Sequence, residues 1–244
     1  MLNMNYRNLN KLTPLSESKN WNEKWGEIFD NYQQDLRHAY YIHAILKPDE
    51  RKILEIGAGS FRDMAELRRR GINCEGMDFS EEAVQRAKQK FPEFSEVIHQ
   101  MSAFDLPYQD KTFDMSYHNG FWILFDDEQI KKLLKEQVRV TKKRIVATVH
   151  NAHNQQFFDY FNKLKIDDPL YDIRFFTIDE IVGLMNEVCS SVEIIPVGKG
   201  KKYHEDLLIK DGITDPQKIR EIFFKNSLDY LESSERLMCI GTIK

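Results

Sequence analysis

The sequence predicts an α/β fold in which a mostly parallel sheet carries helices on both faces. Two observations lead to this prediction. Short apolar segments alternate with amphipathic helical segments through the middle of the chain, which is the order expected of parallel strands joined by helices. The 244 residues include only 11 glycines and 7 prolines, and no flexible linker or internal repeat divides them. We therefore expect residues 1–244 to form a single domain.

Seven segments are strand candidates because each is a short run rich in apolar residues. In chain order they are residues 52–56, 73–78, 97–101, 113–117, 144–149, 192–196 and 237–243. Ligands of an open α/β sheet bind outside the carboxyl ends of its strands. The residues that follow each strand are therefore the first candidates for a functional site.

The helix candidates combine an apolar stripe at helical spacing with an N-terminal capping residue. Ser80 and Asp126 precede acidic first turns, and Thr177 forms a capping box with Glu180. The expected helices are residues 62–70, 80–90, 126–139, 177–188 and 217–230. Gly71 directly follows the first of them, in the position favoured for a left-handed C-terminal cap.

Three segments lie outside this alternation, namely residues 1–45, 151–176 and 198–234. The first is rich in aromatic residues and precedes the sheet, so we expect it to form an N-terminal helical cap over the crevice. The other two are insertions between late strands. We expect at least one of them to line the substrate site: residues 151–176 would be placed to roof the crevice, and the side of the sheet on which 198–234 lies is left open.

Composition and charge exclude several classes of protein. Lysine and arginine number 35 against 39 aspartates and glutamates, and this acidic balance argues against a nucleic-acid binder. No apolar run approaches the ~20 residues that span a bilayer, and the first residues lack the apolar stretch of a secretory signal. The basic residues between 131 and 144 are interpreted as a solvated helix face and turn. Cys74, Cys189 and Cys239 have no zinc-site spacing, which indicates reduced thiols in a cytoplasmic protein.

The turn after the first strand is the most informative segment. Gly57-Ala58-Gly59 lies between a strand and a helix, where glycines let the backbone adopt positive φ and approach a ligand closely. A nicotinamide-binding fingerprint requires a third glycine where this chain has Arg62. Glu55, two residues before the first glycine, is not part of that fingerprint either. A nicotinamide-dependent oxidoreductase is therefore disfavoured.

The ordered motifs resemble those of class I S-adenosylmethionine-dependent methyltransferases. The blocks that carry the resemblance are Glu55–Ser60, Glu75–Ser80, Asp105–Asp114 and Arg174–Thr177. The match is strong over residues 46–150 and weaker over 174–197 and 236–243. The resemblance implies a Rossmann-like seven-stranded sheet with an antiparallel last strand, a cofactor-binding core at 46–150, and S-adenosylmethionine as the cofactor.

The resemblance also implies roles for particular residues. Asp78 follows Glu55 by about 20 positions, as expected for an acid that binds ribose hydroxyls, although it could instead cap the next helix. Glu55 would orient the glycine loop or serve as a buried structural acid. Arg37 would pair with the cofactor's carboxylate or remain an exposed helix residue. The expected cofactor-binding residues are Glu55, Gly57, Ala58, Gly59, Asp78, Phe79, Ser102, Ala103, Tyr32, Arg37 and Asn119.

Two positions depart from the family's pattern. Phe61 stands where the family often has glycine, which makes the glycine loop less permissive. Ser102 stands where the family often has the aspartate that binds the adenine amino group, and a hydroxyl accepts that bond more weakly. Both departures concern cofactor affinity, and they motivate the alternative of a cofactor-binding scaffold or regulatory protein with little activity.

Histidines at the strand ends are the candidates for acid–base chemistry, because neutral imidazole titrates near working pH. His118, after the fourth strand, is the leading candidate for a base or substrate contact, with a structural histidine as the alternative. His150, after the fifth strand, is the second candidate. His150 and His153 lack a third ligand at a suitable spacing, so no metal site is expected.

These observations predict methyl transfer to an oxygen or nitrogen of a small-molecule acceptor, without nucleic-acid or membrane partners. Separate insertions suit a lidded pocket, whereas a protein or RNA substrate is disfavoured by the acidic balance and by the lack of an added binding domain. Aromatic residues near 121–125 and 157–161 are candidates for either pocket or core. The sequence does not indicate the oligomeric state.

Overall fold

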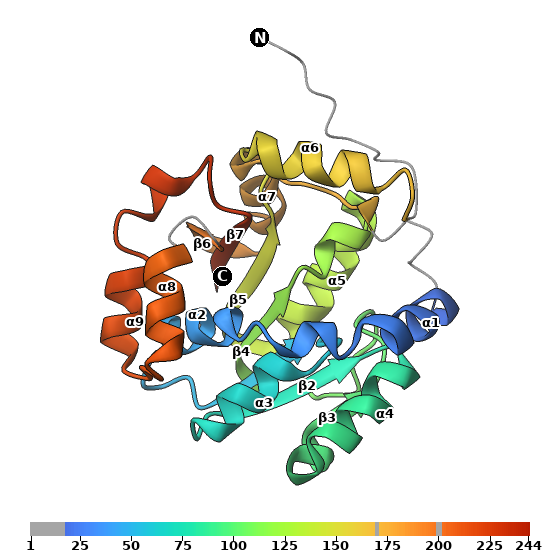
Figure 1. Cartoon of the computed structure of the whole chain (residues 1–244). Coiled ribbons are helices and arrows are strands. Elements are labelled where there is room, and N and C mark those ends of the chain that lie inside the picture. Colours follow the sequence, from blue (N-terminus) through green and yellow to red (C-terminus); the bar gives the residue numbers. More distant parts are fainter. Residues whose placement is uncertain (1–17, 169–170, 199–201) are drawn as a thin grey trace.

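The structure is a computed structural model that describes residues 18–168, 171–198 and 202–244 (Figure 1). These residues form a seven-stranded sheet with the strand order β3-β2-β1-β4-β5-β7-β6. The strands are β1 (Lys52–Ile56), β2 (Asn73–Asp78), β3 (Ile98–Gln100), β4 (Phe113–Asn119), β5 (Thr141–His150), β6 (Cys189–Val197) and β7 (Arg236–Ile243). The strands β1 to β5 are parallel, whereas β7 is antiparallel to β5 and β6. The expected sheet, including its antiparallel last strand, is confirmed.

Helices cover both faces of the sheet. They are α1 (Ser18–Ile28), α2 (Arg37–Ile45), α3 (Arg62–Arg69), α4 (Glu81–Lys90), α5 (Asp127–Val140), α6 (Gln155–Leu164), α7 (Ile178–Met185), α8 (Lys202–Lys210) and α9 (Pro216–Phe223). One core joins the sheet to α2, α3, α4, α8 and α9, and a second core joins the other face to α5 and α7. Each strand thus buries alternate residues against different helices.

The local signals in the sequence define several element ends as expected. The Ser80 hydroxyl accepts a hydrogen bond from Ala83 N at the start of α4. Capping boxes begin α5, at Asp126 and Gln129, and α7, at Thr177 and Glu180. These caps satisfy amide groups that have no partner inside the helix, which favours starting the helix at that residue.

Several elements differ from their expected bounds, and two of them show why. The helix expected at 217–230 is α9, which ends at Phe223, followed by a separate 3₁₀ turn at Ser227–Tyr230. Asn226 between them has a φ of 53°, a left-handed conformation that interrupts the helix. Strand β5 begins at Thr141 rather than 144, because Thr141 already pairs with Phe113 of β4.

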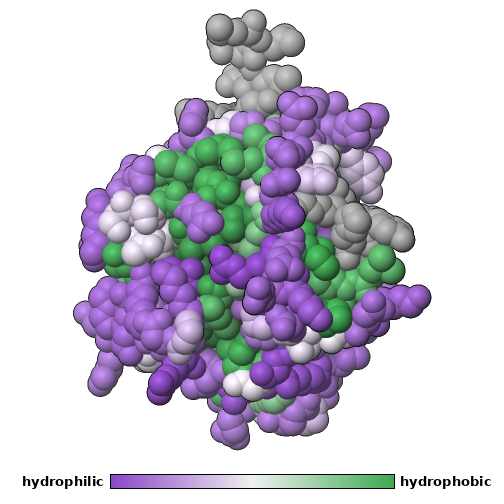
Figure 2. Space-filling model, turned by 90° about the vertical axis from the view of Figure 1, so that its left-hand side faces the viewer, coloured by the Kyte–Doolittle hydropathy of each residue, from purple (hydrophilic) through white to green (hydrophobic). Residues whose placement is uncertain are grey.

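The segments outside the alternation occupy different places. Helices α8 and α9 lie beside α2, on the side of the molecule away from α1 and α4 (Figure 1). That side shows apolar surface between polar residues (Figure 2). Within the described part of the chain, no helix has the length and apolar character needed to cross a bilayer.

Candidate functional site

A cavity of about 290 Å³ lies at the carboxyl ends of the parallel strands. Its floor is formed by the last residue of β5 and by the segments that follow β1, β2, β3 and β4, and its roof comes from α1. This is the position that open α/β sheets use for ligands. The volume is near the lower end of the range for ligand pockets.

The glycine loop forms one wall of the pocket. Gly57 has a φ of 62° and Gly59 a φ of 53°, conformations that favour glycine. A Cβ atom on Gly59 would lie 2.1 Å from Cζ2 of Trp25, and one on Gly57 would lie 2.6 Å from Cδ2 of Phe121. The bare backbone therefore allows close approach from the pocket side, as a bound cofactor requires.

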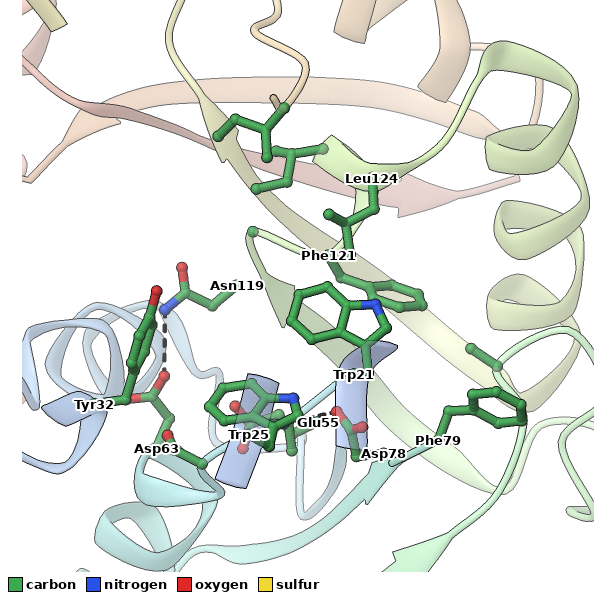
Figure 3. Close-up of a pocket in the computed structure, with 18 of the residues that line it drawn as sticks. Trp21, Trp25, Tyr32, Glu55, Asp63, Asp78, Phe79, Asn119, Phe121 and Leu124 are labelled. Carbon is green, nitrogen blue, oxygen red and sulfur yellow. Dashed lines mark hydrogen bonds between the residues drawn. The ribbon is translucent and has the colours of Figure 1, made fainter. Parts of the chain in front are cut away.

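Asp78 lies beside this loop at the end of β2 and lines the pocket (Figure 3). Its Oδ2 accepts a hydrogen bond from Gly59 N at 2.8 Å, and its Oδ1 accepts one from Ser80 N at 2.8 Å. Burial raises the pKa of Asp78 although these amide donors oppose the shift. Ser80 is the N-cap of α4, so Asp78 is left to hold the glycine loop and to face the pocket.

Glu55 is almost fully buried below the loop. Its Oε2 accepts a hydrogen bond from Met64 N at 2.9 Å, which links β1 to the first turn of α3. Burial and the neighbouring carboxylate of Asp63 raise the pKa of Glu55 well above its ordinary value. Glu55 is thus a buried acid that links β1 to α3 and also lines the pocket.

Asp63 is a pocket residue that the sequence analysis missed. Its Oδ2 accepts a hydrogen bond from Asn119 Nδ2 at 3.4 Å (Figure 3) and lies 3.3 Å from His38 Nδ1. Its buried Oδ1 has no hydrogen-bond partner. Burial opposes ionisation, but Arg62 and His38 lower the pKa of Asp63. The sequence signal that could have identified Asp63 is its place as an acid in the first turn of the helix after the glycine loop.

Phe61, which departs from the family's pattern, leaves the pocket open. It has a φ of 54°, a conformation that costs a residue with a side chain about 1–2 kcal/mol. Its ring is fully buried and contacts Gly76 and Met64 on the far side of the loop. The missing glycine is thus accommodated by backbone strain and core packing.

The expected adenine side of the pocket contains Phe79, Ser102, Ala103 and Phe104. Ser102 accepts a hydrogen bond from Phe104 N at 3.2 Å through its hydroxyl, so its lone pairs are partly engaged within the loop. Phe79 is half exposed and lies beyond Asp78, away from Tyr32 and Asn119 (Figure 3).

Aromatic residues of the N-terminal segment cover the pocket (Figure 3). Trp21 and Trp25 stack with ring centroids 6.1 Å apart, and Trp25 meets Tyr32 edge-on at 5.5 Å. All three line the pocket together with Ile28. Tyr32 was expected at the cofactor, and α1 adds the two tryptophans as a roof.

Arg37 does not line the pocket, which corrects its expected pairing with the cofactor. It begins α2 and is buried, with its Nε 2.8 Å from Glu205 Oε2 and further ion pairs to Asp35 and Asp206. These three carboxylates hold the guanidinium against α8, so it is not an exposed helix arginine either. Arg62 lines the pocket instead, with its guanidinium 5.6 Å from the centre of the Tyr32 ring.

His118 also lies outside the pocket, which corrects its selection as the leading base candidate. Side chains alternate between the two faces along a strand. Asn119 faces the pocket with Asp63, whereas His118 is fully buried on the opposite face, with its ring centroid 4.6 Å from that of Trp122. Burial lowers the pKa of His118 to about 3. It is a neutral core residue.

His150 does line the pocket, at the end of β5. Its ring stacks on Phe157 at 5.5 Å with an interplanar angle of 4°. Its buried Nδ1 has no hydrogen-bond partner. Burial and the charge of Arg236 lower the pKa of His150 well below its ordinary value. The imidazole is therefore neutral at neutral pH and able to accept or donate one hydrogen bond.

The remaining walls are apolar and come from two segments. The turn after β4 contributes Phe121, Ile123, Leu124 and Phe125, and the insertion at 151–176 contributes Phe161, Tyr171 and Ile173. Among the described residues of the 198–234 insertion, none lines the pocket. No group of three potential metal ligands occurs within the described residues.

Comparisons with known proteins agree with this architecture. The methyltransferase domain family matches residues 54–146. A solved structure from Thermotoga maritima, described as an S-adenosylmethionine-dependent methyltransferase and possible histamine N-methyltransferase, is 20% identical with a TM-score of 0.63, and the match covers 92% of this chain and 99% of that chain. No curated protein matches.

Two further solved structures share the fold. A methyltransferase from Archaeoglobus fulgidus is 18% identical with a TM-score of 0.59, covering 91% of this chain and 97% of that one. Geranyl diphosphate C-methyltransferase from Streptomyces coelicolor, in complex with S-adenosylhomocysteine, is 15% identical with a TM-score of 0.55. The match covers 96% of this chain and 88% of that chain. The chain therefore carries a class I S-adenosylmethionine-dependent methyltransferase domain.

Proposed function

We propose that this enzyme transfers a methyl group to an oxygen or nitrogen of a small molecule. The observation that carries the proposal is a partly open pocket, roofed by α1, that joins a glycine-loop half to an aromatic half. A macromolecular substrate would need an open surface at the same place. The aromatic walls and the neutral His150 suit a small acceptor that loses a proton on methylation.

The cofactor half would hold S-adenosylmethionine through backbone and acidic groups. Asp78 would accept hydrogen bonds from the ribose hydroxyls, and the loop at Gly57 and Gly59 would contact the methionine moiety. Asp63, whose Oδ1 lies 3.7 Å from Arg62 Nε but has no hydrogen bond, would accept one from the ammonium group. The bound cofactor supplies a methyl group already activated on a sulfonium.

Because the methyl group is activated, the protein mainly positions the acceptor and excludes water. Trp21 and Trp25 provide the apolar cover for that exclusion. His150 would accept the proton that the acceptor's oxygen or nitrogen releases, since its imidazole is neutral at working pH. A general base contributes about 100-fold or more to such a step.

Cofactor binding is tested first by calorimetric titration with S-adenosylmethionine, S-adenosylhomocysteine and NADH. We expect micromolar binding of the two sulfur compounds and none of NADH. Tryptophan fluorescence provides a second readout, because Trp25 contacts Gly59. We expect the signal change on binding to be reduced in W25F, which keeps Trp21 in the pocket, and to be unchanged in W122F, whose tryptophan lies in the core. Absence of binding would contradict the proposal.

Turnover is then tested with labelled S-adenosylmethionine and a panel of small phenols, amines and acids. The position of the methyl group in the product, read by NMR, distinguishes oxygen or nitrogen from carbon as the acceptor. We expect H150Q to lose at least about 10-fold in kcat while H118F retains wild-type turnover. Tight cofactor binding without turnover on any acceptor would favour the scaffold alternative instead.

A further inference from the structure

Arg236 is a pocket residue to which the proposed function gives no role. It begins β7, directly opposite His150 of β5 in the antiparallel ladder. Residues opposite each other in such a ladder project from the same face of the sheet. Both side chains line the pocket. Nη1 of Arg236 lies 2.9 Å from the position that a Cβ of Gly120 would take, so the guanidinium extends across β5 to the end of β4.

The guanidinium of Arg236 has no hydrogen bond or ion pair to another described residue. Other arginines that are buried at their side chains are matched by acids: Arg144 by Glu50, Arg37 by Glu205, and Arg174 by Asp127. Burial lowers the pKa of Arg236, although Glu235 opposes that shift. Arg236 is partly exposed towards the pocket, where an unmatched guanidinium can bind an anion.

His150 supplies a second, independent sign of a missing ligand. The residue is only 3% exposed, and its buried Nδ1 has no hydrogen-bond partner. A neutral imidazole with a proton on Nδ1 can donate a hydrogen bond to an anion that Arg236 attracts. An unpartnered ring nitrogen and an unmatched guanidinium thus belong to two residues that are paired across adjacent strands.

We propose that Arg236 and His150 form a carboxylate-binding subsite in the acceptor half of the pocket. The acceptor is then a small carboxylic acid with a flat apolar or aromatic body, which Phe161, Tyr171 and Ile173 would contact. This inference rests on the proposed function, because it names the class of acceptor for the same pocket.

A carboxylate fits this subsite better than a more highly charged group. A guanidinium forms two parallel hydrogen bonds with the two oxygens of one carboxylate. The other pocket arginine, Arg62, is already engaged by Asp63 and by the carbonyl of Tyr32. One unmatched positive charge remains, and it matches a single negative charge.

The location favours the acceptor's carboxylate over that of the cofactor. From the glycine loop after β1, the cofactor half extends towards Asp78 and Ser102, at the ends of β2 and β3. Arg236 belongs to β7, on the side of β1 opposite to β2 and β3, and its guanidinium reaches Gly120 at the end of β4. The turn after Gly120 supplies Phe121 and Phe125 to the aromatic walls, so an anion at Arg236 lies beside those walls.

The test uses the protein saturated with S-adenosylhomocysteine and measures the binding of benzoate and phenylacetate against benzamide and phenylacetamide by calorimetry. We expect the wild type to prefer each acid over its amide by about 10-fold or more, the range of a charge-assisted pair. R236Q should lose this preference, and R236K should retain part of it. R51Q, which alters an exposed arginine before β1, should behave as wild type.

A second arm compares S-adenosylhomocysteine with methylthioadenosine, which lacks the amino-acid carboxylate. We expect R236Q to bind both with wild-type affinity, which also shows that the variant is folded. A selective loss of S-adenosylhomocysteine binding would assign Arg236 to the cofactor and overturn the acceptor subsite.

The outcomes separate this inference from the proposed function. Cofactor binding without any preference for acids over amides overturns the subsite and leaves the methyltransferase assignment intact. If the wild type binds no cofactor but binds benzoate in an Arg236-dependent manner, the subsite stands and the proposed function fails.

Discussion

The two halves of the pocket are built in different ways. In the cofactor half, the polar groups are backbone amides and the acids Glu55, Asp63 and Asp78, supplied by segments at or shortly after the ends of β1 and β2. In the acceptor half, the groups are side chains from α1, β5, β7 and the insertion at 151–176, which are far apart in the sequence. The first half depends on local chain geometry, and the second depends on how distant segments pack.

This difference has consequences for substitution. A backbone cradle is disturbed by changes at very few positions, namely its glycines and the acid that holds it. A side-chain pocket can change its specificity without changing the sheet, since loops and insertions on a rigid scaffold vary easily. We therefore expect large effects on cofactor binding from a few residues, and effects on acceptor choice from many.

The strongest test of the cofactor half is Asp78→Asn. The substitution removes the charge that Gly59 N and Ser80 N contact and that would bind the ribose hydroxyls. We expect about 100-fold weaker binding of S-adenosylhomocysteine by calorimetry, from the loss of charge-assisted hydrogen bonds. D211N, at an exposed position, serves as the control. Unchanged affinity in D78N would exclude the ribose role.

Gly59→Ala tests whether the loop depends on backbone conformation. The new alanine would have to adopt a φ of 53°, and its Cβ would meet Trp25. We therefore expect about 2 kcal/mol of destabilisation. In a chain of this length, that lowers Tm by about 4–8 °C. Gly183→Ala is the matched control, because open space surrounds that helical position, and we expect it to be stabilising by about 0.5–1 kcal/mol. Equal effects at both positions would contradict the interpretation.

His118→Phe distinguishes the buried core from the pocket. The pKa of His118 is lowered to about 3, so the folded protein resists protonation while the unfolded chain gains a proton below about pH 6.5. Stability from this neutral histidine is present above that pH and is lost as the pH falls towards the folded pKa. H118F should remove this loss.

The quantity to compare is the free energy of unfolding of H118F minus that of the wild type. We expect this difference to be about 2 kcal/mol larger at pH 5 than at pH 7.5. Urea unfolding at both pH values measures the difference. Cofactor affinity, measured in parallel, should not change, because His118 faces away from the pocket. A pH-independent difference would mean that His118 becomes protonated in the folded state.

The smallest expected effect belongs to Ser102→Ala. The Ser102 hydroxyl already accepts a hydrogen bond from Phe104 N, so it has little capacity left for an adenine amino group. We expect at most about 3-fold weaker cofactor binding, compared with no change for S190A at the exposed edge of β6. A loss above 10-fold would show that Ser102 replaces the family's aspartate fully.

Several site residues were predictable because their signals are local. Glycine spacing and the acid at the end of the second strand identified Gly57, Gly59 and Asp78, and the structure places all three on the pocket. His118 and Arg37 were wrong for reasons that lie outside their own segments. One residue of strand alternation turns His118 to the other face, and the acids of α8 hold Arg37 away from the pocket.

The sequence alone determined the order of strands and helices, their caps and the glycine loop, since these depend on periodicity and on interactions over a few residues. The tertiary structure decided which side chains share the pocket. Only the antiparallel pairing of β7 with β5 brings Arg236 opposite His150, across 86 residues of chain. Such contacts depend on packing between distant segments, and no local pattern encodes them.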